Sequence, residues 1–99
     1  MTVSGLQDSY YHRGGSDPLL GMTIPAMLAD VLRKYPDCPA IVSRHQDRRL
    51  SYAEFAAAAD RLAKGLLGSG FGRGDRIGIW STNNVEWVLL QMATARIGA

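Results

Sequence analysis

The chain has 99 residues, of which 46% are hydrophobic and 20% charged, a balance typical of a folded globular protein and not of a disordered tail. Its 11 basic and 9 acidic residues leave a net charge of +2 and are spread along the sequence, so no basic cluster indicates a nucleic-acid partner. The single cysteine, Cys38, excludes an internal disulfide and fits a reducing compartment. No apolar run approaches about 18 residues and the N-terminus lacks a secretory pattern, so we expect no transmembrane segment and a cytoplasmic location.

The first 35 residues are predicted to form an extended arm and a helix. Residues 1–22 show no sustained periodicity, and we expect them to form an N-terminal arm that precedes a folded part at 23–99. Thr23 is a suitable N-cap for a helix that ends before Pro36, because the residue before a proline is disfavoured in helical conformation. The apolar residues at helical spacing predict its buried face: Ile24, Met27, Leu28, Val31 and Tyr35.

A β-hairpin and a second helix are expected next. Residues 40–43 and 49–52 are predicted to be short strands, joined by a polar turn at 46–48. Ser51 is then the N-cap of the second helix, and Glu54 three residues further on completes a capping box. Six residues are predicted to form its inward face: Phe55, Ala58, Ala59, Leu62, Ala63 and Leu66.

The outer face of this second helix carries Asp60 and Lys64, four residues apart with the acid first, which favours an ion pair. The glycine-rich stretch 68–74 follows the helix and precedes a predicted strand. It contains no Gly-x-Gly-x-x-Gly frame, so it indicates a connector that ends a helix and not a phosphate-binding loop.

Residues 76–81 are predicted to be a strand and residues 84–97 a helix. Apolar residues lie on nearly all sides of that helix, which favours a position inside a larger structure. A strand–helix unit is normally continued by a second, parallel strand, which is not found before Ala99. We therefore expect a truncated chain, the front part of a larger protein.

Candidate ligand-binding residues are few. Ser81–Asn84 lies where the predicted strand meets a helix N-terminus, a position that suits ligands and anions, although capping of the helix is favoured. His12 and His45 lack a cysteine or acid at metal-ligand spacing, and we expect both to be exposed polar residues. Trp80 and Trp87 are expected to be core aromatics. We therefore predict no catalytic, cofactor-binding or metal-binding residue in these 99 residues.

Short motifs follow one another from residue 18 to the end of the chain: Pro18–Ile24, Tyr35–Val42, Arg49–Phe55, Asp60–Leu66, Gly74–Ser81, Asn83, Glu86–Val88 and Ala95–Ala99. Their order and spacing resemble the N-terminal start of the adenylate-forming, AMP-binding ligases, and more closely the acyl-CoA synthetases. The first motif is similar to the medium- and long-chain fatty acyl branch.

The resemblance implies a two-step reaction for the parent protein. ATP and a fatty or other carboxylic acid form an acyl-adenylate, with Mg²⁺ and release of pyrophosphate, and coenzyme A then takes the acyl group. The family's phosphate loop, ribose-binding acid and C-terminal lysine do not occur in these residues. The resemblance therefore implies an incomplete α/β fold (helix, hairpin, helix, strand, helix), inactive and without cofactor by itself, whose partner is the remainder of the large domain.

Two alternatives remain open at this stage. The chain is also compatible with part of an amino-acid or aryl-acid adenylating enzyme, whose acid-binding residues would lie beyond Ala99. It is further compatible with a small interaction module without catalytic activity.

Overall fold

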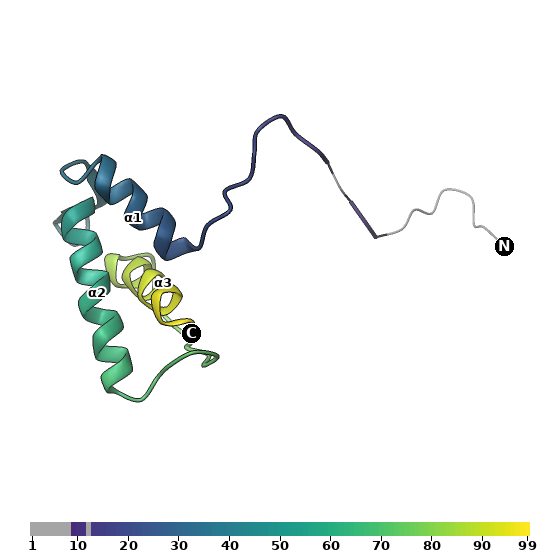
Figure 1. Ribbon diagram of the computed structural model, residues 1–99. Helices are drawn as coiled ribbons and strands as arrows, with labels where there is room; N and C mark the ends of the chain where they lie inside the picture. The colour runs from purple at the N-terminus through teal and green to yellow at the C-terminus, as the bar shows by residue number, and fades with distance from the viewer. Residues whose placement is uncertain (1–8, 12) are drawn as a thin grey trace.

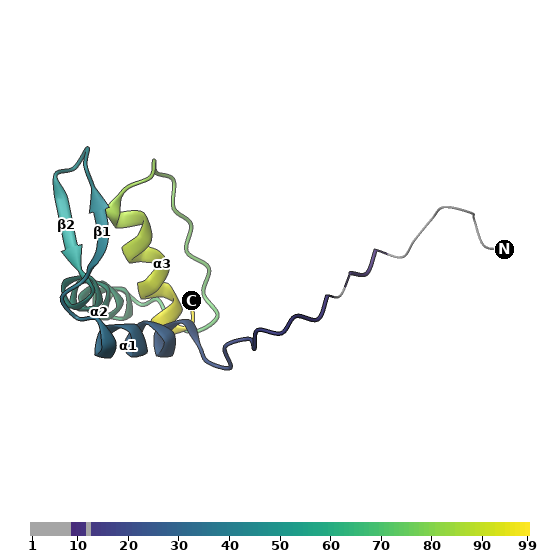
Figure 2. The same cartoon turned by 90° about the horizontal axis from the view of Figure 1, so that it is seen from above.

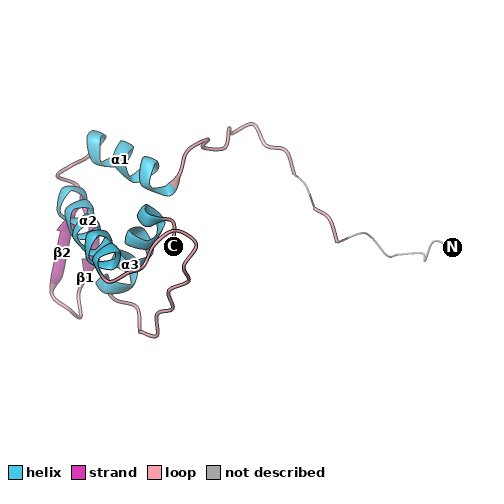
Figure 3. Cartoon of the chain, turned by 60° about the horizontal axis from the view of Figure 1, so that its bottom comes forward, coloured by secondary structure: helices cyan, strands magenta, loops and turns pink. Residues whose placement is uncertain are grey.

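The computed structural model describes residues 9–11 and 13–99. Three helices and one antiparallel hairpin make up the described part of the chain, in the α/β class that we predicted (Figure 1). In chain order these elements are α1 (Ile24–Lys34), β1 (Pro39–Ser43), β2 (Arg48–Ser51), α2 (Tyr52–Gly68) and α3 (Val85–Ile97). Figure 3 distinguishes the hairpin from the helices and shows the long loop between α2 and α3.

The predicted bounds of α1 are confirmed by its caps. The Thr23 hydroxyl accepts a hydrogen bond from the Ala26 amide at 3.2 Å, and the Tyr35 amide donates to the Val31 carbonyl at 2.8 Å. Pro36 then follows, a residue that cannot continue the helix.

The predicted buried face of α1 is only partly correct. Met27, Leu28 and Val31 are half-buried, whereas Ile24 and Tyr35 are 50% and 55% exposed. The helix contacts both α2 and α3. Periodicity identifies the apolar face of a helix but not how much of that face a neighbour covers.

The hairpin begins one residue earlier in each strand than predicted. Val42 pairs with Arg49 and Ser43 with Arg48, and the register is irregular near Pro39. The turn is tight because Asp47 adopts a left-handed conformation, with φ of 51°. Aspartate tolerates that conformation better than most residues.

Helix α2 begins with the predicted capping box. The Glu54 amide donates to the Ser51 hydroxyl at 3.2 Å, and the Ser51 amide donates to the Glu54 carboxylate at 3.0 Å. The predicted ion pair is also present, with Lys64 Nζ 3.0 Å from Asp60 Oδ2. Asp60 accepts a second contact from Arg96 Nε at 3.1 Å, which links α2 to α3.

The core lies between α2 and α3, with the hairpin and α1 packed beside it. Its buried apolar residues combine large and small side chains: Phe55, Ala59 and Ala63 from α2, and Val85, Leu89 and Ala93 from α3. The three alanines allow the two helices to approach closely. The inward face predicted for α2 is therefore confirmed.

One predicted element is missing. Residues 76–81 form no strand, although residues 76–80 run as an extended chain in which Ile77 and Ile79 are half-buried while Gly78 and Trp80 are exposed. Within the described part of the chain, no backbone group of residues 76–80 forms a hydrogen bond. A strand requires a neighbouring strand for its ladder, and no described segment lies in that position.

The described part of the N-terminal arm extends away from the helices (Figure 2). Residues 13–22 contain no helix or strand, and Leu19 is 95% exposed. The principal extents of the molecule, 58 × 34 × 29 Å, reflect this projecting arm. No helix of the described residues has the length and apolar character needed to cross a bilayer.

Candidate functional site

Hydrogen bonds of the Gln46 side chain hold the hairpin turn against the start of α3. Its side-chain oxygen accepts from the Val85 amide at 2.9 Å and from the Ser43 hydroxyl at 2.8 Å. Its side-chain nitrogen donates to Glu86 Oε2 at 2.9 Å, while Arg48 Nη1 donates to Glu86 Oε1 at 2.9 Å. We did not identify Gln46 from the sequence, because it lies 39 residues before Val85 and no local pattern links the two.

The same contacts act on the acidity of Glu86. Its pKa is held below the ordinary glutamate value, chiefly by the hydrogen bond from Gln46 and then by its own backbone amide and by Arg48. The carboxylate therefore stays ionised where the hairpin and α3 meet.

The turn Ser81–Asn84 caps α3, which is the role that we favoured over ligand binding from the sequence. Asn84 Oδ1 accepts from the Trp87 amide at 3.0 Å, and Asn84 Nδ2 donates to the Ser81 hydroxyl at 2.8 Å. The Ser81 hydroxyl in turn donates to the Thr82 carbonyl at 3.0 Å. Because Asn84 and Gln46 already occupy two amides of the first turn, little remains there to bind an anion.

The glycine-rich stretch 68–74 is the connector that we predicted. Helix α2 ends at Gly68, and Gly70 and Gly74 adopt left-handed conformations with φ of 96° and 84°. A Cβ added at any glycine of this stretch would meet no atom within 4 Å, so the backbone approaches nothing that a side chain would displace. A phosphate-binding loop would instead open a helix.

The described residues do not fit a nucleotide or a magnesium ion. They contain no group of three or more histidine, cysteine or acidic side chains able to hold a metal ion, and no buried side-chain polar atom without a hydrogen-bond partner. His45 is exposed, with Nδ1 3.4 Å from the Ser43 hydroxyl, and Cys38 is an exposed free thiol. His12 lies outside the described residues.

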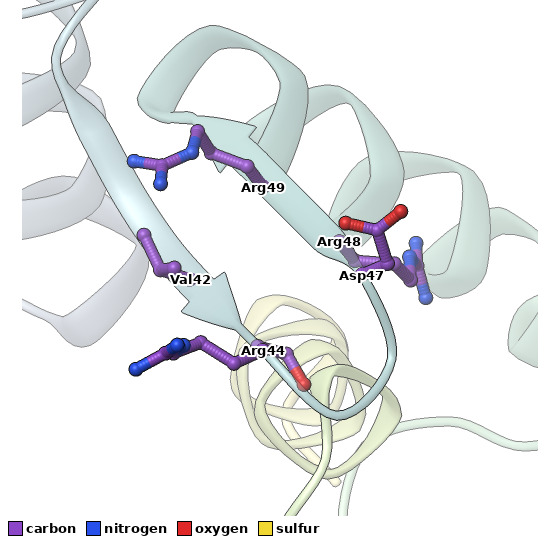
Figure 4. A pocket seen from close by; sticks show the side chains of 6 residues that line it. Val42, Arg44, Asp47, Arg48 and Arg49 are labelled. Atoms are coloured by element: carbon purple, nitrogen blue, oxygen red, sulfur yellow. The ribbon is translucent and has the colours of Figure 1, made fainter.

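A hollow on the outer side of the hairpin carries arginines (Figure 4). It has a volume of about 360 Å³ and is lined by Val42, Ser43, Arg44, Asp47, Arg48 and Arg49. In Figure 4 the side chain of Arg49 extends from β2 toward β1 and that of Arg44 lies on the same side, whereas Arg48 and Asp47 lie on the other side of the hairpin. The arrangement is a basic surface, without the glycine-rich backbone that cradles a phosphate chain.

A second hollow is apolar. It has a volume of about 430 Å³ and lies between α2, α3 and the extended residue Ile79. It is lined by five apolar residues, Ala58, Leu62, Ile79, Leu89 and Leu90, and by three charged ones, Arg48, Arg61 and Glu86. We call it the α2–α3 hollow.

The two tryptophans are not core residues in this chain, contrary to our prediction. Trp80 is fully exposed and Trp87 is 37% exposed. Trp80 lies on the side of the extended segment opposite Ile79, where no described residue covers it. Large exposed apolar groups such as Trp80 are typical of a surface that contacts another protein segment.

These features accompany a clear family relationship. A family model described as "AMP-binding enzyme" matches residues 28–99. The chain therefore belongs to the AMP-binding enzyme family, as its motifs suggested.

Two relatives illustrate the relationship. The chain is 40% identical over 97 residues to the medium-chain acyl-CoA ligase ACSF2, mitochondrial, of Danio rerio, a match that covers 98% of this chain and 16% of that protein. Its fold resembles that of a Mycobacterium tuberculosis fatty acyl CoA synthetase, with a TM-score of 0.73 and 33% identity over 77% of this chain and 15% of the other.

A third likeness concerns the fold alone. The N-terminal subdomain of Klebsiella oxytoca NpsA matches with a TM-score of 0.72 and 24% identity, over 77% of this chain and 19% of that one. The chain thus spans less than a fifth of the length of each of these proteins.

Proposed function

We propose that the chain supplies the first part of the large domain of an acyl-CoA synthetase, an ATP-dependent acid–thiol ligase. In the proposed reaction a fatty acid attacks the α-phosphate of ATP to give an acyl-adenylate and pyrophosphate. The thiol of coenzyme A then forms the thioester and releases AMP. The observation that carries this proposal is the 40% identity to a medium-chain acyl-CoA ligase over nearly the whole chain.

The proposed contribution of these residues is structural. The described part of the chain offers no cradle for ATP, and Mg²⁺, which we propose as a further requirement of the parent enzyme, finds no ligand set there. It offers instead an apolar hollow and an exposed tryptophan. We propose that the remainder of the large domain covers these surfaces.

We propose a division of the chain into an arm, residues 1–22, and a folded part, residues 23–99. The cap at Thr23 and the exposed, irregular residues 13–22 support the division. We also propose a cytoplasmic location. The Danio rerio relative is named a mitochondrial protein, so fractionation of cells that express the tagged protein decides between the two compartments.

Thioester formation tests the proposed activity. The protein translated from the complete reading frame that contains these codons is incubated with octanoate, ATP, Mg²⁺ and coenzyme A. We expect octanoyl-CoA and AMP in equal amounts, and no product after chelation of Mg²⁺ by EDTA. Adenylation of an aryl or amino acid in place of fatty acids would contradict the proposal and favour the alternative branch.

A further inference from the structure

The outward face of the hairpin gathers two arginines around an exposed valine. Val42 of β1 pairs with Arg49 of β2 across the ladder, and directly opposed residues of such a pair lie on the same face of the sheet. Arg44 follows Val42 by two residues and lies on the same side of the hairpin as Arg49 (Figure 4). Val42 is 47% exposed, so the core does not cover this side. We call Val42, Arg44 and Arg49 the arginine face.

The two arginines of this face carry uncompensated charge. Within the described part of the chain, none of the ion pairs includes Arg44 or Arg49. Asp47, the acidic residue that lines the same hollow, lies on the other side of the hairpin (Figure 4). Arg48 also lies on that other side and is already paired with Glu86. The arginine face is therefore positively charged and suited to an anionic partner.

The shape of the face favours an extended anionic surface over a small anion. The hollow that it lines has a volume of about 360 Å³, and all of its lining residues belong to the hairpin, so no second element closes over a bound ion. Figure 2 shows the hairpin extending from α2 away from α1. An arginine can lay its aliphatic stem along apolar surface while its guanidinium stays among polar groups, and Val42 supplies an apolar contact beside the two stems. Such a mixture of positive charge and apolar surface suits the headgroup boundary of a bilayer.

We propose that the arginine face binds the anionic phospholipid surface of a membrane. Arg44 and Arg49 contact lipid phosphates, and Val42 lies at the level of the headgroups. The inference rests on the proposed function, since the acyl chain of a fatty acid partitions into bilayers and an enzyme that activates this substrate takes it up at their surface. The association is peripheral and sensitive to salt, because the attraction falls off within a Debye length of the surface.

Vesicle sedimentation tests the association on the protein translated from the complete reading frame. One set of vesicles is phosphatidylcholine alone, and the other contains about a third phosphatidylglycerol, which supplies a negative surface potential. We expect the protein to sediment with the anionic vesicles and not with the neutral ones. Raising the salt from about 0.1 M to about 1 M, which shortens the Debye length from about 10 Å to about 3 Å, should release it.

Charge substitutions show whether the arginine face is responsible. Arg44→Gln and Arg49→Gln should each lower the partition coefficient about fivefold, and together about 25-fold, since each basic side chain adds separately to the attraction. Arg33→Gln is the matched control, because it removes the same charge from α1, where Lys34 still pairs with Asp30. It should change the coefficient by less than about twofold, since a charge far from the bound surface is screened.

A lysine variant separates attraction by charge from recognition by the guanidinium group. Arg44→Lys combined with Arg49→Lys should retain the binding, because a membrane surface attracts charge and does not require the planar fork of arginine. Circular dichroism spectra of all variants should match that of the parent protein, since both hairpin positions are exposed.

Several outcomes would overturn the inference. No sedimentation with anionic vesicles, equal sedimentation with neutral ones, or no loss in the double glutamine variant would show that the arginine face binds no membrane. Release by inorganic phosphate at constant ionic strength, or loss of binding in the lysine variant, would indicate a site for a small phosphate ion instead. Tighter binding of poly-glutamate than of the vesicles would indicate an acidic protein partner. The assay contains neither ATP nor coenzyme A, so its failure is distinct from failure of thioester formation.

Discussion

At the scale of single residues, the Gln46 side chain joins parts of the chain that are distant in sequence. It bonds the Val85 amide, the Ser43 hydroxyl and the Glu86 carboxylate, and thereby holds the hairpin turn against the first turn of α3. Val85 is 1% exposed, so its amide has little access to water as a substitute partner. Such an amide is costly to leave unpaired.

Truncation of Gln46 should therefore destabilise the fold. We expect Gln46→Ala to lower the free energy of unfolding by about 1–3 kcal/mol, the cost of an orphaned buried donor. Gln91→Ala, at an exposed position of α3, is the matched control and should change it by less than about 0.5 kcal/mol. Urea denaturation followed by circular dichroism measures both. Equal effects of the two substitutions would show that the Gln46 contacts contribute nothing.

Acidification should weaken the same junction. The pKa of Glu86 is lowered in the folded chain, so in the acidic range the unfolded chain binds more protons than the folded one. Stability from Glu86 is thus fully present above the ordinary glutamate pKa and is lost as the pH falls through the folded value. Thermal melts between about pH 6 and about pH 3 should show a shallower decline for Glu86→Gln than for the parent chain. Identical slopes would refute the role of Glu86.

The roles of only some of these residues could be predicted from the sequence. The roles of Ser51 and Glu54 were predictable because a capping box is a pattern of four consecutive positions. The role of Gln46 was not, because its partners are set by how the hairpin packs on α3. Trp80 was expected in the core from its apolar character, but only a neighbouring segment could cover it.

At the scale of elements, local signals predicted the helices and the hairpin well. The caps at Thr23 and Ser51 mark two helix starts, and the glycines after α2 mark its end. The predicted strand at 76–81 was wrong for this chain because a strand depends on a partner far away in sequence or in another segment. Residues 76–80 nevertheless have the extended backbone and the alternation of half-buried and exposed residues that are typical of a strand.

The cap of α2 allows a quantitative test at this scale. Ser51→Ala removes the acceptor for the Glu54 amide and should cost about 1 kcal/mol of unfolding free energy. Ser16→Ala, in the exposed arm, serves as the control and should be neutral. Chemical denaturation of the two variants side by side gives the difference. If Ser51→Ala left the free energy of unfolding unchanged, the cap would contribute nothing and packing alone would stabilise α2.

At the scale of the whole molecule, a small core carries the fold while much apolar surface stays uncovered. The buried core lies between α2 and α3, next to the α2–α3 hollow, and Trp80 is fully exposed. Leu89 is 9% exposed within that core, whereas Leu67 of α2 is 54% exposed. The two leucines therefore differ in burial but not in chemistry.

Truncation of each leucine to alanine distinguishes a core position from a surface position. We expect Leu89→Ala to lower the free energy of unfolding by about 2–5 kcal/mol, through lost burial and a residual cavity. Leu67→Ala should stay within about 0.5 kcal/mol of the parent chain. Urea titrations monitored by tryptophan fluorescence provide both values. Similar losses at the two positions would place the core elsewhere.

Membership of the AMP-binding family is the basis of our central claim, which is a proposal: these residues support the adenylating site of a larger enzyme and do not form it. ATP–pyrophosphate exchange with fatty acids, measured on the 99-residue chain beside the product of the complete reading frame, tests this claim most directly. We predict exchange by the longer protein and none above background by the 99-residue chain. Robust fatty-acid-dependent exchange by the 99-residue chain would contradict the claim.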